Sequence, residues 1–377
     1  MTHVAIVGSG FAGCTAVKAL RKRGFGGAIT MVSPLPELFF YPSLIWVPSG
    51  RRGEQDLRID LRGFLKANSV GHRPAAATGL DAASRALHTD DGDLAYDYLI
   101  VGSGARYLRK LPGIEHAHIA CAGWREVKAF SDALGSMDGG TVAFGFAGNP
   151  NEPSAMRGGP IFEFLFGVDT LLRQQKRRDR FNLVFFSPAP KPGKRMGEKA
   201  IERILQEVAS RGIERHFGNK LQAFEADRIV TEGGEFRADL ILFIPGMTGP
   251  EWLSHSGLAL SEGGLVQADA QCRAVGTDGV YVAGDVGSFP GPEWKPKQAH
   301  MADLQAECAA KNLLAELAGR PATHTFKTEL LCIVDSLNTG SLVFRGERRN
   351  ISLKMPPMHW AKVFFERYYL RPYLKAR

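Results

Sequence analysis

The sequence predicts an α/β protein with two doubly wound domains and a separate C-terminal segment. Three observations lead to this fold class. A strand, a glycine-rich turn and a helix come first, apolar strands and helices alternate again between about residues 112 and 244, and a basic, aromatic stretch comes last. At 377 residues, with 44% hydrophobic and 23% charged side chains, the chain is long enough for two or three domains with their own cores.

The first domain is expected to open with a βαβ unit. A crossover helix between two strands that run in the same direction is the usual start of a doubly wound sheet. The predicted helix ends in basic residues before Gly24, which suits its C-terminus. The expected elements are a strand from His3 or Val4, a helix at 11–23, strands at 28–32 and 96–101, and a long loop at 39–47.

The second domain repeats the alternation, with strands at 141–147 and 182–186 and helices at 160–175 and 198–211. The strands at 239–246 and 279–285 are then expected to return the chain to the first domain and complete it. A C-terminal segment of strands and a helix-like tail should follow. The predicted domains are 1–112 with 245–320 (the first, discontinuous), 113–244 (a second Rossmann-like domain) and 321–377 (the C-terminal segment).

The formal charge of +8 at pH 7 is concentrated in the tail. Residues 345–377 contain nine Lys or Arg and two Glu, so the rest of the chain is nearly neutral. Basic residues mixed with aromatic ones favour contact with an anionic membrane surface, and no nucleic-acid-binding motif accompanies them. The alternative is a helix packed on the body or on a second subunit, which leaves a homo-oligomer open.

The expected location, and the expectation of no disulfide framework, both rest on patterns that the sequence does not contain. No apolar run approaches the roughly 20 residues that span a bilayer, and the first strand begins too early for a signal peptide. We therefore expect a peripheral, monotopic protein on the cytoplasmic side of a membrane. Five cysteines are an odd set and suggest no disulfide framework, and no metal site is predicted.

Gly8, Gly10 and Gly13 form a G-x-G-x-x-G motif between the first strand and the first helix. The first glycine permits a tight turn, the second lets the backbone approach a pyrophosphate, and the third lets the helix pack on the strand. Together with Phe11 and Ala12, they predict a dinucleotide site at the helix N-terminus. A glycine turn that only packs is the alternative.

Ser33 ends the second strand, where a ribose-binding carboxylate is usual, and a hydroxyl can still bond a ribose, less strongly. Two further motifs indicate which nucleotide binds. In flavoproteins with two dinucleotide-binding domains, a strand ending in small residues lies close to the cofactor, and a later Gly-Asp pair bonds the ribityl chain. Both occur here in that order and predict FAD. They are Gly102, Ser103 and Gly104, and Gly284 with Asp285.

The corresponding turn of the second domain is different. Residues 144–152 lack G-x-G-x-x-G, and two prolines and an acid follow Gly148. These residues hinder the approach of a pyrophosphate, so we expect no dedicated NAD(P)H site. The electrons should come from another donor.

Several other stretches match one flavoprotein family over nearly the whole chain. They are Gly8–Gly13, Ser33, Tyr41–Val47, Gly159–Phe164, Pro296–Lys297, Cys332–Asp335, Asn338–Gly340 and His359–Tyr368. On these residues the chain resembles the sulfide:quinone oxidoreductase family. The resemblance implies FAD, a membrane quinone as electron acceptor and a membrane-facing C-terminal segment. It also implies that Lys297 lies at the pyrimidine edge of the flavin.

Members of that family oxidise sulfide at a pair of cysteines beside FAD. One of the pair matches Cys332, and a further family cysteine matches Cys121, but the second of the pair, expected near Arg157, is missing. No intramolecular bridge can then form unless Cys121 supplies the second thiol. The donor is therefore left open as sulfide or another anion. A basic loop of Arg157, Lys191, Lys194 and Arg195 either binds such an anion or is a set of solvated charges.

Glu163 has two interpretations. It is either a carboxylate that suits the helix dipole in the first turn after Pro160, or a proton acceptor near the flavin. We predict an FAD-dependent oxidoreductase that passes two electrons from a small-molecule donor to membrane quinone, with Cys332, Cys121 and Glu163 as catalytic residues. The alternatives are a type II NADH:quinone reductase-like enzyme, and a non-catalytic flavoprotein that binds a partner or senses redox state.

Overall fold

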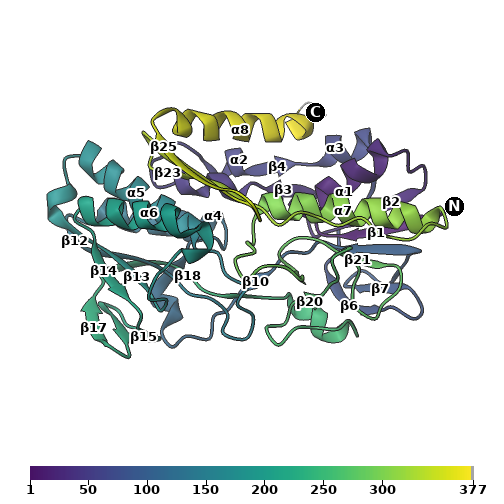
Figure 1. Ribbon diagram of the computed structural model, residues 1–377, viewed down its shortest axis with the longest axis horizontal. Helices are drawn as coiled ribbons and strands as arrows, with labels where there is room; N and C mark the ends of the chain where they lie inside the picture. The colour runs from purple at the N-terminus through teal and green to yellow at the C-terminus, as the bar shows by residue number, and fades with distance from the viewer. Residues whose placement is uncertain (375–377) are drawn as a thin grey trace.

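The computed structural model describes residues 1–374, which form two α/β halves and a C-terminal layer (Figure 1). One half contains α1, α7 and the N-terminus, and lies on the right of the view. The other contains α4, α5 and α6, and lies on the left. The last helix, α8 (Pro357–Leu374), runs along the top of the molecule and contacts α3, β4, β23 and β24.

The first half is built on a five-stranded parallel sheet with the order β21-β9-β1-β2-β5. Its central strands are buried and almost wholly apolar, as parallel strands covered on both faces usually are. The helices α1 (Phe11–Lys22) and α7 (Ala299–Leu317) pack against each other beside it. The strands are β1 (His3–Val7), β2 (Ala28–Val32), β5 (Gly71–Arg73), β9 (Tyr98–Val101) and β21 (Val280–Val282).

The second half is built on another parallel sheet, with the order β11-β18-β12-β13-β14. Its core is rich in phenylalanine. The strands are β11 (Ala117–Ile119), β12 (Gly140–Phe146), β13 (Phe181–Ser187), β14 (Glu214–Phe217) and β18 (Leu240–Ile244), and the helices are α4 (Trp124–Ser136), α5 (Gly159–Gln174) and α6 (Glu198–Ser210).

One strand lies in a different sheet from the one expected. β18 pairs with β11 and β12 in the second sheet, so the expectation that 239–246 completes the first domain is wrong. β21 does pair with β9 in the first sheet. Both strands are short apolar runs that suit the interior of either sheet, so their local sequence does not distinguish the two positions. The domain boundaries stay a prediction.

The stretch expected as a long loop at 39–47 is more ordered than predicted. It contains the 3₁₀ helix η1 (Tyr41–Trp46), in which Pro42 lies in the first turn. Its apolar side chains are buried against the second core, which holds the backbone in this short helix. The other short elements are β3 (Glu37–Phe39), α2 (Glu54–Leu57), β4 (Arg58–Asp60), α3 (Arg62–Ala67), β6 (Ala77–Asp81), β7 (Ala86–Thr89), β8 (Leu94–Ala95), β10 (Arg106–Tyr107), η2 (Ile114–His116), η3 (Arg178–Arg180), η4 (Lys194–Met196), β15 (Leu221–Phe224), β16 (Arg228–Thr231), β17 (Gly234–Arg237), β19 (Met247–Thr248), η5 (Glu251–His255), β20 (Val266–Gln267) and β22 (Gly287–Ser288).

The C-terminal layer is an antiparallel sheet followed by α8. The strands β23 (Leu330–Asp335), β24 (Gly340–Arg345) and β25 (Asn350–Met355) pair in sequence order. β23 contacts both α5 and α8, so it connects the second half to the last helix. Within residues 1–374, no helix has the length and apolar character needed to cross a membrane.

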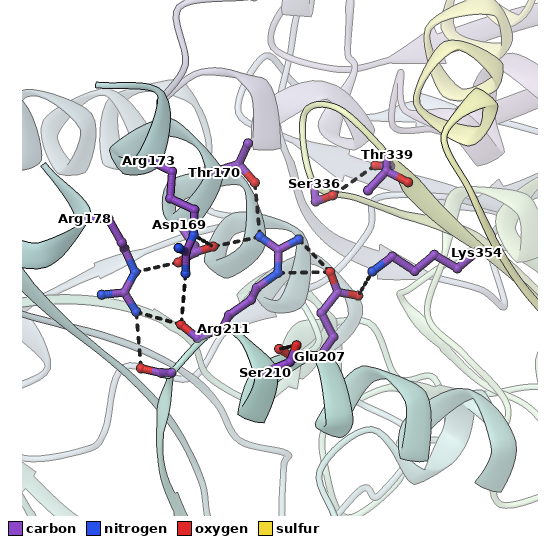
Figure 2. A network of polar contacts seen from close by, with 11 residues as sticks. Asp169, Thr170, Arg173, Arg178, Glu207, Ser210, Arg211, Ser336, Thr339 and Lys354 are labelled. Carbon is purple, nitrogen blue, oxygen red and sulfur yellow. Dashed lines mark hydrogen bonds and ion pairs between the residues drawn. The ribbon is translucent and has the colours of Figure 1, made fainter. Parts of the chain in front are cut away.

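A buried carboxylate anchors the second half (Figure 2). Asp169 of α5 is fully buried and accepts hydrogen bonds from three arginines: Arg173 Nε at 2.9 Å, Arg178 Nε at 2.6 Å and Arg211 Nη1 at 2.8 Å. Burial opposes the charge, but these hydrogen bonds hold the pKa of Asp169 below its ordinary value. The cluster therefore connects α5 to the segments that follow it in the chain.

Basic residues of the C-terminal layer also contact the second half. Lys354 Nζ lies 2.9 Å from Glu207 Oε2, as Figure 2 shows, and Arg345 Nη1 donates to the Arg195 carbonyl at 2.8 Å. Part of the positive charge of the tail therefore has partners within the chain. Lys375 and Arg377, which contribute to the tail charge counted from the sequence, lie outside the described residues.

Candidate functional site

The three glycines after β1 differ in what surrounds them. A Cβ on Gly8 would lie 2.5 Å from the Gly102 carbonyl oxygen, and one on Gly13 would lie 2.0 Å from the Gly8 carbonyl oxygen. Gly8 also has a φ of 103°, which favours glycine. A Cβ on Gly10 would meet nothing within 4 Å. The outer glycines are therefore required for packing, whereas the backbone at Gly10 faces open space at the N-terminus of α1.

Both apolar and polar side chains surround this turn. The Phe11 ring lies 5.8 Å from that of Phe40, and Ala12 is buried. Ser33 Oγ donates to the Leu35 carbonyl at 2.8 Å. Ser103 Oγ is buried and has no hydrogen-bond partner among residues 1–374. Because a buried hydroxyl without a partner is costly, this oxygen is suited to bond a polar group of a ligand.

A hollow opens where β21 ends and α7 begins. Gly284, Asp285, Lys297 and Gln305 are among the residues that line it. Lys297 is buried, and its Nζ donates to the carbonyl oxygens of Asp285, at 3.0 Å, and Gly287. Desolvation lowers the pKa of Lys297 to about 8. This lysine holds the loop after β21 in shape and adds positive charge at the start of α7.

Arg157 occupies the position near which the family resemblance requires a cysteine. Its guanidinium forms an ion pair with Asp285, and its Nε donates to the Lys297 carbonyl at 3.2 Å. Burial opposes its charge, but Asp285 and neighbouring groups raise the pKa of Arg157 above its ordinary value. The turn after β12 is therefore attached to the loop after β21. The structure also shows that the carboxylate of Asp285, expected at the ribityl chain, already has a partner.

The rest of the basic loop is largely engaged within the chain. Lys191 forms an ion pair with Glu198, and Arg195 Nη1 donates to the Ser154 carbonyl at 3.2 Å. Lys194 is exposed. Lys191 and Arg195 therefore already have partners within the chain, which argues against a preformed site for an anionic donor.

All five cysteines lie among the described residues, and each is a free thiol. Cys121 is buried and Cys332 is partly buried. Burial is the main cause that raises the pKa of Cys121 to about 11 and that of Cys332 to about 12, and the charge of Glu163 contributes to both shifts. The structure therefore places both thiols within the electrostatic influence of one carboxylate, and both are protonated at neutral pH.

Glu163 is buried in α5 and contacts the C-terminal layer through Asp335 and Lys362. It lies in the second helical turn, so the expectation of a first-turn carboxylate that suits the helix dipole is wrong. The sequence missed this because α5 begins one residue before Pro160. Glu163 Oε1 accepts the Asp335 N–H at 2.9 Å and forms an ion pair with Lys362 of α8. Burial raises the pKa of Glu163 to about 7, although Lys362 opposes the shift.

The sequence alone places none of three polar residues of α8 in the site. Lys362 is one of the basic residues expected at a membrane surface, whereas the Lys362 ammonium pairs with the buried Glu163. His359, Lys362 and Glu366 are spaced at i, i+3 and i+7, so they share one helix face, and each side chain has a partner in the body of the protein. His359 Nδ1 lies 2.6 Å from Asp335 Oδ2. This i, i+3, i+7 spacing of polar residues was a signal that could have identified the face.

Comparisons with known proteins identify the family of this chain. The family model for pyridine nucleotide-disulphide oxidoreductases matches residues 2–306. The chain belongs to this family. It is 22% identical to the sulfide-quinone reductase of Aquifex aeolicus, over 98% of this chain and 90% of that protein. It is 26% identical to an NADH dehydrogenase-like protein of Mycobacterium tuberculosis, over 76% of this chain and 73% of that protein.

The fold also matches a solved structure. The sulfide:quinone oxidoreductase of Aquifex aeolicus superposes with a TM-score of 0.89 at 21% identity, covering 100% of this chain and 92% of that one. The resemblance read from the sequence and the doubly wound fold class are therefore confirmed. As a pyridine nucleotide-disulphide oxidoreductase of this type, the chain is an FAD-dependent oxidoreductase.

The residues of this flavoprotein fit FAD. The open backbone at Gly10, at the N-terminus of α1, suits a pyrophosphate, and the unpartnered Ser103 hydroxyl suits a polar group of the cofactor. Lys297 supplies positive charge at the start of α7. The roles of the individual cofactor-binding and catalytic residues stay predictions.

Proposed function

We propose that this flavoprotein passes two electrons from a small-molecule donor, with a sulfur species as the first candidate, to a membrane quinone near α8. The position of Glu163 supports this proposal most. Buried Glu163 forms an ion pair with Lys362 of α8, and its charge acts on the thiols of Cys121 and Cys332. A sulfur donor and a quinone both exchange protons as they exchange electrons, so a buried carboxylate that interacts with both the thiols and α8 is suited to both.

The chain supplies the thiols and a base for the donor. Cys332 is proposed as the thiol that takes sulfur, with Cys121 as its partner. Both are protonated at neutral pH, so a nucleophilic role requires a base. Glu163, with a pKa of about 7, is about half ionised at neutral pH and is the group we propose for this role.

When bound, FAD accepts an electron pair from a donor and releases it to an acceptor. In this proposal the residues of the chain hold FAD in position and supply the charged groups around it. Lys297 and the N-terminal end of α7 place positive charge in the hollow, which suits a cofactor that becomes more negative on reduction. The ion pair of Arg157 and Asp285 is net neutral and fixes the adjacent loops.

The test is an anaerobic titration of the purified holoprotein, followed by the absorbance of its flavin. We expect sulfide to bleach the flavin band and a short-chain quinone to restore it. Cys332→Ser should abolish bleaching by sulfide, and Cys121→Ser should slow it at least tenfold. Cys308→Ser is the matched control, because this buried thiol donates to the His324 carbonyl at 3.2 Å and accepts from Asn312 Nδ2 at 3.5 Å, which a serine hydroxyl can also do.

Two other results of this titration would indicate a different function. Bleaching by NADH but not by sulfide would indicate an NADH-dependent reductase, although the turn after β12 lacks the glycine motif that such an enzyme uses. A flavin that stays oxidised with every donor would favour the non-catalytic alternative, which the missing second cysteine also suggests.

A further inference from the structure

A second hollow lies on the α8 side of the molecule, between η1 and the segment after it, the turn at 335–338 and α8. Its volume is about 530 Å³. The residues that line it include Trp46, Arg51, Arg52, Trp360 and Arg367. Three arginines and two tryptophans around one opening have no role in the electron-transfer function proposed above. None of the candidate catalytic or cofactor-binding residues lines this hollow.

The charge of the lining is not balanced. Arg52 pairs with Glu366, so its charge is compensated. Arg51 and Arg367 have no carboxylate partner among residues 1–374, and Arg367 is exposed with no hydrogen bond from its side chain in that part of the chain. Two uncompensated guanidinium groups beside one opening attract an anion.

Arg51 is held in position by the chain. Its Nη1 donates to the Leu337 carbonyl at 2.7 Å and lies 2.8 Å from His359 Nε2. Since a guanidinium can only donate, Nε2 is the acceptor, and the ring proton is on Nδ1, which faces Asp335 Oδ2 at 2.6 Å. His359 therefore orients Arg51 without cancelling its charge. An arginine fixed in this way has little side-chain entropy to lose on binding an oxyanion.

The surface next to the hollow is apolar and exposed. Trp360 is 71% exposed and Phe364, one helical turn further along α8, is 70% exposed. Large aromatic side chains with this exposure on one helix face are typical of a surface that contacts lipid or a partner. The ligand that suits both features has an anionic group beside an apolar portion.

We propose that this hollow binds the phosphate of an anionic phospholipid headgroup, held by Arg51 and Arg367, with the acyl chains against Trp360 and Phe364. This inference rests on the membrane contact in the proposed function and makes it specific for one class of lipid. An inorganic phosphate would satisfy the arginines but would leave the exposed aromatic side chains uncovered, so the lipid is favoured.

The test uses the holoprotein and its tryptophan fluorescence, to which Trp46 and Trp360 contribute together with three other tryptophans. A short-chain phosphatidylglycerol, kept monomeric, is titrated beside the matching phosphatidylcholine and beside inorganic phosphate. We expect saturable binding of phosphatidylglycerol, at least about tenfold tighter than the other two. Equal binding of inorganic phosphate would overturn the lipid assignment, and so would the absence of any saturable change.

Matched charge variants test the residues. The Arg51→Gln/Arg367→Gln variant should lose at least about tenfold in affinity for phosphatidylglycerol and for vesicles that contain it. The Arg348→Gln/Arg371→Gln variant removes the same charge from exposed positions outside the hollow and should lose much less. The single Arg367→Gln variant breaks no contact within the described chain, so its folding should be normal. Equal losses in both double variants would mean that only net charge matters and would overturn the site.

The experiment also separates this inference from the proposed function. Reduction by sulfide and reoxidation by a short-chain quinone need no lipid, so they can fail while the headgroup site stands. A loss of vesicle binding in Trp360→Ala/Phe364→Ala with no preference for anionic lipid would support membrane contact but reject the headgroup site.

Discussion

Arg157 and Asp285, 128 residues apart in sequence, form an ion pair between the turn after β12 and the loop after β21. Each of the two residues is about four-fifths buried. The pair joins the second half of the molecule to the first at the place where the cofactor and the donor are expected to meet. Arg157 therefore lies near the position where the sulfide:quinone oxidoreductase family has a cysteine, and its partner there is Asp285.

Removing one partner of this pair should destabilise the protein. Arg157→Gln leaves the carboxylate of Asp285 without its counter-charge in a mostly buried site, so we expect a loss of about 2–3 kcal/mol. The measurement is the midpoint of thermal unfolding of the holoprotein. Adding Asp285→Asn should recover part of the loss. Arg228→Gln, which removes an exposed pair with Glu225, should cost under about 0.5 kcal/mol. A similar loss in both single variants would contradict the prediction.

Glu163 should make stability fall as pH rises. Its folded pKa of about 7 lies above the ordinary value of 4.5, so between these values the folded state binds the proton more strongly than the unfolded state. The stabilisation from that proton is complete below about pH 4.5 and is lost as pH rises through 7. Relative to Glu163→Gln, wild-type protein should lose about 2–3 kcal/mol between pH 5 and pH 8.

Thermal unfolding at these two pH values checks this prediction. Glu232→Gln, at an exposed position, serves as the control and should follow wild type at both values. If Glu163→Gln also follows wild type, Glu163 has an ordinary pKa, and its proposed part in proton transfer at neutral pH would lose its basis.

Lys297 should be needed to retain FAD. Its Nζ bonds to the carbonyl oxygens of Asp285 and Gly287 shape the loop that lines the hollow, so Lys297→Met should weaken FAD binding at least tenfold. The measurement is the ratio of flavin to protein absorbance after dialysis, with the affinity of the apoprotein for added FAD. Lys220→Met, at an exposed position outside the hollow, should retain the cofactor. A fully loaded Lys297→Met protein would remove this lysine from the proposed site.

Asp169 should be among the most sensitive positions for stability. Asp169→Asn leaves three arginines around a neutral amide in a fully buried site, and we expect a loss of about 3–5 kcal/mol. Arg173→Gln should cost much less, because this side chain is half exposed and two other arginines remain. Thermal unfolding of both variants gives the comparison, and equal losses would show that the charge of Asp169 is unimportant.

Much of the architecture followed from local patterns. Continuous apolar runs predicted the strands of both sheets, and the spacing of Gly8, Gly10 and Gly13 predicted a nucleotide-binding turn, because only glycine satisfies the steric demands of its outer positions. The sheet that contains the strand at 239–246 could not be predicted, because a short apolar run fits either sheet. The 3₁₀ helix at Tyr41–Trp46 was missed because burial of its side chains, rather than a local signal, holds it in place.

The sequence by itself determined the alternation of strands and helices, the glycine turn for FAD and the absence of a second cysteine near Arg157. Tertiary structure alone decided the sheet that contains β18, the partners of Arg157 and Asp285, and the ion pair of Glu163 with Lys362, which spans 199 residues. Periodicity and glycine spacing reflect interactions within a few residues, so they can be read along the chain. Charged side chains from distant elements form pairs only when the sheets and α8 pack together. No local sequence pattern indicates which side chains will pair.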